Sequence, residues 1–202
     1  YLQEKFAKKG LMILYTAPWP GQGFYTKFPV NSVSDFKGKK LRIYSTATQQ
    51  MGSMLGFNAT ILPFAEIPQA FSTGLIEALF TSPQTGIDIQ AWDNTKHFTY
   101  AGAIFSKNAV VVTKKAFNAL SKGDQSNMLA AAKKAELRGW EMSAETTKKQ
   151  IGILKKNGMS SKNAPDEVIS KMKSIGLEMM KNWRSKASPE ANAVLDRYLS
   201  MR

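Results

Sequence analysis

Residues 39–80 alternate strand-like and helix-like segments, and this pattern constrains the fold more than any other feature of the chain. Two amphipathic segments, which end at Gly56 and Gly74, separate three apolar runs that are typical of strands. The three runs cover residues 39–44, 58–62 and 75–80. Strands joined through helices normally lie parallel, with right-handed crossovers. The sequence therefore predicts an α/β fold.

The segments before this unit are shorter. Leu11–Tyr15 is a continuous apolar run, which predicts a strand buried on both faces. Residues 16–23 contain two prolines and two glycines, so they are predicted to form an irregular loop.

Helices are predicted for the second half of the chain. Apolar residues recur at helical spacing from Trp140 to Leu154, and Gly158 ends that long helix. Pro165 and Ser188 open two further helices.

The charge of the chain allows two hypotheses about its partner. The formal net charge is +13, and residues 107–202 carry nineteen Lys/Arg against nine Asp/Glu. One hypothesis is a basic module that binds nucleic acid or another anionic surface. Only five of the 28 cations are arginine, however, and arginine is the residue that best reads bases and phosphates. A solvated basic surface is the favoured hypothesis, and no nucleic-acid partner is expected.

Residues for catalysis or metal binding are scarce. The chain has no cysteine and one histidine, His97, so neither a thiolate site nor a zinc site is expected. No Gly-x-Ser-x-Gly elbow, phosphate-binding glycine motif or convincing pair of carboxylates is present. We therefore expect a protein that is not an enzyme and that uses no cofactor and no metal.

Two polar features remain as candidates for a ligand site. Arg42 interrupts an apolar strand, and a neutral polar turn runs from Thr81 to Thr85 after another strand. A guanidinium binds a carboxylate through two parallel hydrogen bonds. Arg42 could equally point outward, or pair with Glu66 or Glu77. The turn could simply cap a helix that begins at Pro83.

The residues around these two features resemble the solute-binding proteins of TRAP (tripartite ATP-independent periplasmic) transporters, of the DctP type. The resemblance is strongest over Asp35-Phe-Lys-Gly-Lys-Lys-Leu-Arg-Ile and over Leu62-Pro-Phe-Ala-Glu-Ile-Pro-Gln-Ala-Phe. It implies a periplasmic-binding-protein-like fold of two lobes with mixed sheets and long C-terminal helices. It also implies a periplasmic receptor that closes over an organic acid and docks on a membrane permease, and we expect a monomer.

The resemblance assigns the candidate ligand-binding residues. Arg42 matches the arginine that binds the ligand carboxylate in this family, and Phe64 matches the aromatic of the Pro-Phe-x-Glu motif. Thr81, Ser82, Gln84 and Thr85 match the hydrogen-bonding turn. Trp19 and Gln22 match a further segment that lines the ligand. The local sequence alone slightly favours Trp19 as a packing residue, and the resemblance favours the pocket wall.

The chain departs from the family pattern in two ways. Gln22 stands near the place of a second arginine, so one cationic anchor predicts a monocarboxylate or a less charged ligand. A first lobe and a signal peptide are expected ahead of Tyr1, so the sequence is interpreted as a fragment. The predicted division is 1–19 (end of the first lobe), 20–107 (second lobe), 108–147 (a strand and helix crossing to the first lobe) and 148–202 (C-terminal helices packing on the second lobe).

Overall fold

The computed structural model describes residues 1–201, which form two compact units. Each unit combines segments that are distant in the sequence. Unit 1 comprises Tyr1–Pro18, Lys107–Ser143 and Met179–Arg202, and unit 2 comprises Trp19–Ser106 and Ala144–Glu178.

Unit 2 is built on a six-stranded mixed sheet with the order β4-β3-β5-β2-β6-β8. The strands are β4 (Asn58–Ile61), β3 (Lys40–Ile43), β5 (Ala78–Thr81), β2 (Gln22–Thr26), β6 (His97–Ala103) and β8 (Ser160–Asn163). β3 pairs in parallel with β4 and β5, which confirms the pairing predicted for 39–80. β2 lies antiparallel between β5 and β6, and β8 extends the sheet in parallel with β6.

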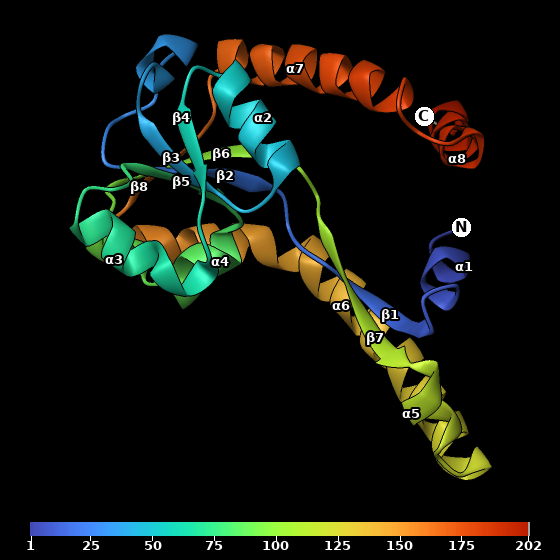
Figure 1. Cartoon of the computed structure of the whole chain (residues 1–202). Helices are drawn as coiled ribbons and strands as arrows, with labels where there is room; N and C mark the ends of the chain where they lie inside the picture. Colours follow the sequence, from blue (N-terminus) through green and yellow to red (C-terminus); the bar gives the residue numbers. More distant parts are fainter. Residues whose placement is uncertain (202) are drawn as a thin grey trace. The chain divides into compact units, whose positions relative to one another are not determined.

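Helices cover both faces of this sheet (Figure 1). α2 (Thr46–Met54) and the N-terminal part of α7 (Asp166–Arg184) lie on one face. α3 (Ile67–Ser72), α4 (Pro83–Asp88) and the C-terminal part of α6 (Lys122–Lys156) lie on the other. Short 3₁₀ turns occupy Val33–Phe36, Phe64–Glu66 and Ala91–Asp93.

Side chains alternate between the two faces of β2, so each face has its own core. Phe24 packs against Phe80, with ring centroids 4.8 Å apart, on one face. Tyr25 packs against Phe98, with centroids 4.4 Å apart, on the other face. All four rings are fully buried. This close packing on both faces holds β2 in place, and β2 begins at the candidate site.

Unit 1 contains a two-stranded antiparallel ribbon of β1 (Leu11–Pro18) and β7 (Lys107–Thr113). It also contains α1 (Leu2–Ala7), α5 (Lys114–Asn118), the N-terminal part of α6, and α8 (Pro189–Ser200). The Glu136 carboxylate of α6 accepts hydrogen bonds from the Thr16 hydroxyl (2.7 Å) and backbone N–H (2.9 Å). These bonds, with a smaller effect from Lys107, hold the pKa of Glu136 below its usual value.

Two predictions about residues 11–23 were wrong. β1 is half-buried along its whole length rather than buried on both faces, because it has one partner strand. Regular structure also continues into the predicted loop, since β1 extends to Pro18 and β2 begins at Gln22. A proline is tolerated at the end of such a ribbon, where its missing N–H leaves no ladder bond unmade.

The predicted helices are present, and the longest of them is α6. α6 begins at Lys122 and runs for 35 residues. Ser121 accepts a hydrogen bond from the Asp124 backbone N–H (3.1 Å) and donates one to the Asp124 carboxylate (2.7 Å). Of the helices in residues 1–201, none is long and apolar enough to cross a membrane.

The two units are divided after Pro18, Ser106, Ser143 and Glu178, and residues 179–202 belong to unit 1. In α8, hydrogen bonds from Ser188 and from its own backbone hold the pKa of Glu190 below its usual value, with smaller effects from Lys5 and Lys8 of the same unit. The assignment of these segments to lobes stays a prediction.

Candidate functional site

The candidate residues of unit 2 meet at one edge of the sheet. β3, β4 and β5 are parallel, so their carboxyl ends lie together and place Tyr44, Leu62 and Thr81 at the same edge. β2 runs the opposite way, with Gly23 opposite Thr81, so Gln22 also lies there. In open α/β sheets this edge is where ligands bind.

Arg42 is buried, yet it has no carboxylate partner among residues 1–201. Its side chain is 5% exposed, and its Nε donates to the carbonyl oxygen of Leu62 at 3.1 Å. That is the only hydrogen bond of its guanidinium in the described chain, and none of its nitrogens is a fully buried atom without a partner. The terminal nitrogens therefore keep a small contact with solvent. Burial lowers the pKa of Arg42.

These contacts exclude the alternative environments for Arg42 in the described chain. Glu77 forms an ion pair with Lys39 instead (3.7 Å) and accepts a hydrogen bond from the Lys40 backbone (3.2 Å). Residues 1–201 contain no ion pair between Arg42 and Glu66. The side chain does not point outward either, because it is almost wholly buried. An unpaired buried cation is costly unless something else compensates it.

Tyr44 directly follows β3, two residues after Arg42, and lies beside it. Its ring centroid is 6.0 Å from the guanidinium carbon of Arg42. Its hydroxyl donates to Gln22 Oε1 at 3.0 Å, and Gln22 Nε2 donates to the Ile104 carbonyl (3.1 Å) and to Ser106 Oγ (3.3 Å). Burial raises the pKa of Tyr44, against smaller opposing effects from Gln22 and Arg42. Both the oxygen and the nitrogen of the Gln22 amide are therefore hydrogen-bonded to protein groups.

The turn after β5 begins at Thr81, which is buried. Ser82 caps α4, since its Oγ accepts from the Thr85 backbone N–H at 3.1 Å and lies 3.1 Å from the Thr85 hydroxyl. Both side chains are buried. The capping role predicted as an alternative for Ser82 is therefore present, whereas no side-chain hydrogen bond of Thr81 is formed within residues 1–201.

The Tyr25 hydroxyl supports this turn from the core. It lies 3.2 Å from the Ser82 carbonyl and 3.4 Å from the Pro83 carbonyl. Burial raises the pKa of Tyr25 well above its usual value, and the charge of Asp88 adds to this, so the hydroxyl stays protonated and donates. Gly86 packs against the same hydroxyl so closely that any Cβ there would overlap it.

Gln84 is occupied by two other side chains. Its Nε2 donates to Asp88 Oδ1 at 2.7 Å, and its Oε1 accepts from Gln150 Nε2 of α6 at 2.9 Å. These bonds tie α4 to α6. The predicted role of Gln84 as a ligand contact stays a prediction.

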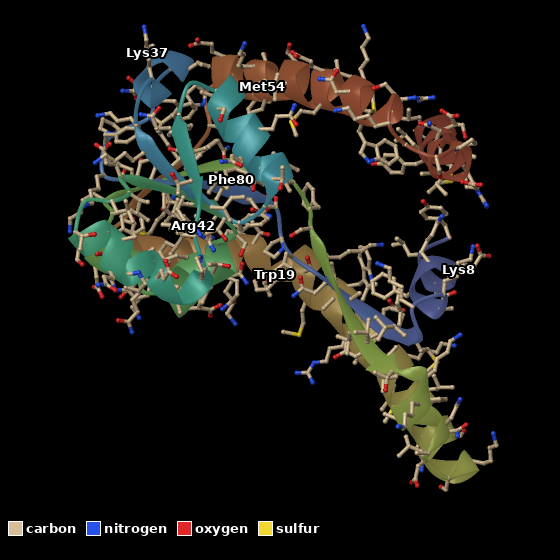
Figure 2. All side chains as sticks on the ribbon, in the orientation of Figure 1. Lys8, Trp19, Lys37, Arg42, Met54 and Phe80 are labelled. Carbon is tan, nitrogen blue, oxygen red and sulfur yellow. The ribbon has the colours of Figure 1, made fainter. Side chains whose placement is uncertain are left out.

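The two aromatic candidates are partly open to solvent. Phe64 follows β4 and is 53% exposed. Trp19 is half-buried, and its backbone N–H donates to the Ser106 carbonyl at 2.8 Å. Figure 2 labels Arg42 beside β4 and Trp19 where the chain leaves β1. The predicted role of Trp19 in the pocket wall stays a prediction.

Sequence reasoning missed Tyr44 as a site residue. The signal was present, because residues two apart on a strand share a face and Tyr44 follows Arg42 at that spacing. The partners Ile104 and Ser106 carry no such signal, since only the pairing of β2 with β6 brings them to Gln22. Within residues 1–201, no group of three or more His, Asp or Glu side chains could hold a metal ion.

Comparisons with known proteins find relatives in sequence and in fold. A curated solute-binding protein of Chromohalobacter salexigens is 25% identical over 156 residues, which are 73% of this chain and 46% of that protein. An extracytoplasmic solute receptor of Bordetella pertussis that binds pyroglutamic acid matches with a TM-score of 0.94 and 38% identity. The match covers 98% of this chain and 65% of that receptor.

A second solved structure gives the same result. It is a TRAP solute-binding protein from a marine metagenome, specific for pyroglutamate, with a TM-score of 0.92 and 33% identity. The match covers 98% of this chain and 66% of that protein, so the chain spans about two thirds of the length of these receptors. These shares accord with the interpretation of the sequence as a fragment. The predicted mixed α/β fold with long helices is confirmed.

The model of family 7 of the bacterial extracellular solute-binding proteins (DctP) matches residues 1–186, and this chain belongs to that family.

Proposed function

We propose that the chain is the ligand-binding part of a periplasmic TRAP solute receptor that takes up a small organic acid and delivers it to a membrane permease. Arg42 carries this proposal. Its guanidinium is buried, and among residues 1–201 its only hydrogen bond goes to the Leu62 carbonyl, which leaves the terminal nitrogens free for a ligand. A ligand carboxylate would supply the missing counter-charge through two parallel hydrogen bonds.

The other groups at the edge suit a ligand with one negative charge. Thr81 and Tyr44 are neutral, and Trp19 and Phe64 offer partly exposed rings. The two solved relatives described above bind pyroglutamate, which has one carboxylate and a neutral lactam. A monocarboxylate of this size, with further neutral hydrogen-bonding groups, is therefore the proposed ligand class.

A thermal-shift screen of the full-length protein tests the proposal. Pyroglutamate and other small monocarboxylates are compared with duplex DNA, which represents the alternative of a basic nucleic-acid module. Ligand at about 100 times its Kd stabilises the folded state by about 2.7 kcal/mol, so a matching acid should raise the melting temperature by several degrees. DNA binding should disappear at about 200 mM salt. DNA binding that persists at this salt, with no stabilisation by any acid, would contradict the proposal.

A further inference from the structure

The hydrogen bonds around Gln22 fix the direction in which the Tyr44 hydroxyl points its proton. The Ile104 carbonyl can only accept, so the Gln22 atom 3.1 Å from it must be the amide nitrogen. The Gln22 amide oxygen then faces the Tyr44 hydroxyl at 3.0 Å. That oxygen can only accept, so Tyr44 must donate to it.

The Gln22 amide, to which Tyr44 donates, is held in place by neighbouring backbone groups. Gln22 is paired with Ala103 in the β2–β6 ladder, next to Ile104. Ile104 has φ = 55°, a left-handed conformation that a β-branched residue rarely adopts. Ser106 Oγ lies 3.3 Å from Gln22 Nε2, and the Ser106 carbonyl accepts from the Trp19 backbone at 2.8 Å. The amide of Gln22 is thus kept from turning over.

The Tyr44 oxygen keeps only acceptor capacity after this bond. Its proton is committed to Gln22, and no other protein group of residues 1–201 bonds to it. The side chain is half-buried beside the Arg42 guanidinium, with 6.0 Å between the ring centroid and the guanidinium carbon. A ligand whose carboxylate pairs with Arg42 would therefore bring the atoms next to that carboxylate toward an acceptor.

We infer that Tyr44 is a specificity residue, which accepts a hydrogen bond from an N–H or O–H group adjacent to the ligand carboxylate. The ligand class is thereby narrowed to small acids that carry such a donor, as lactam acids and 2-hydroxy acids do. An acid with an acceptor at this position places two acceptors against each other and is disfavoured. This inference rests on the proposed function and deepens it.

The test compares two nearly isosteric acids by calorimetry on the full-length protein. One is pyroglutamate, and the other is its lactone analogue, in which an oxygen replaces the ring N–H. The unmodified protein should prefer the lactam by about tenfold to a hundredfold. Tyr44→Phe should bring the two affinities to within about threefold, mainly by weakening the lactam.

A second variant tests the Gln22 acceptor rather than the Tyr44 hydroxyl. Gln22→Met keeps a long side chain but removes the acceptor that holds the Tyr44 proton, so the hydroxyl can turn and donate. The preference for the lactam should then shrink because the lactone gains affinity. Tyr198→Phe, at an exposed position of α8, is the matched control and should leave both affinities unchanged. Circular dichroism confirms that each variant is folded.

The outcomes separate the two proposals. Equal weakening of both acids by Tyr44→Phe, or an unchanged preference, would overturn the role of Tyr44 and leave the receptor function standing. Failure of the unmodified protein to bind these two acids or any other acid of the thermal-shift screen would overturn the proposed function and this inference with it.

Discussion

Arg42→Ala should abolish organic-acid binding while leaving the protein folded. Loss of one partner from a buried, hydrogen-bonded ion pair costs about 2–5 kcal/mol in binding, which is a factor of about 30 to several thousand in Kd. Arg42→Lys should fall in between, because lysine keeps the charge but loses the planar fork and the bond to Leu62. Isothermal titration calorimetry with pyroglutamate measures these changes.

Arg42→Ala should leave the stability of the ligand-free protein unchanged or improved. Arg42 is buried without a carboxylate among residues 1–201, so alanine removes a cation whose desolvation is offset there only by the bond to the Leu62 carbonyl. Arg184→Ala is the matched control, because Arg184 forms an exposed ion pair with Asp196 in unit 1. The control should leave the affinity unaltered. An unaltered Kd in Arg42→Ala itself would contradict the assignment of the anchor.

Gly86→Ala should destabilise the protein strongly although it adds a single methyl group. The new Cβ would overlap the hydroxyl and ring of Tyr25, which is fully buried and supports the Ser82 and Pro83 carbonyls. Overpacking of a core typically costs about 1–3 kcal/mol, and displacing the Tyr25 hydroxyl from its hydrogen bonds adds about 1 kcal/mol more. Urea unfolding of the ligand-free protein measures the loss.

Gly152→Ala provides the matched control in α6. A Cβ at this position meets nothing within 4 Å. Alanine should therefore stabilise the helix by about 0.5–1 kcal/mol. If Gly86→Ala unfolded at the same urea concentration as the unmodified protein, Tyr25 would not be the fixed support of the turn that its contacts imply.

Local sequence patterns predicted the parallel half of the sheet well, because each of β3, β4 and β5 carries its own apolar run and a helix in between. They did not predict β8, since Ser-Ser-Lys-Asn has no apolar signal and becomes a strand only by pairing with β6. The position of β2 between β5 and β6 was also beyond local patterns. Its partners lie more than 50 and 70 residues away along the chain.

The candidate site shows the same division between local and distant information. Arg42 was identifiable because a charge within an apolar strand needs an explanation, and Ser82 because it precedes Pro83 at a helix start. Arg42 is a candidate anchor because no carboxylate of residues 1–201 pairs with it, and no local pattern in the sequence shows this. Glu77, for example, pairs with Lys39 rather than with Arg42. The direction of the hydrogen bond from the Tyr44 hydroxyl to Gln22 likewise depends on the Ile104 carbonyl, which lies 60 residues further along the chain.

The position of the ligand carboxylate in a crystal structure of the full-length protein with pyroglutamate tests the central claim most directly. The proposal predicts both carboxylate oxygens on the terminal nitrogens of Arg42, at about 2.7–2.9 Å, with the Leu62 bond to Nε retained. A bound acid whose carboxylate is held by other groups, with Arg42 still bonded only to Leu62, would contradict it.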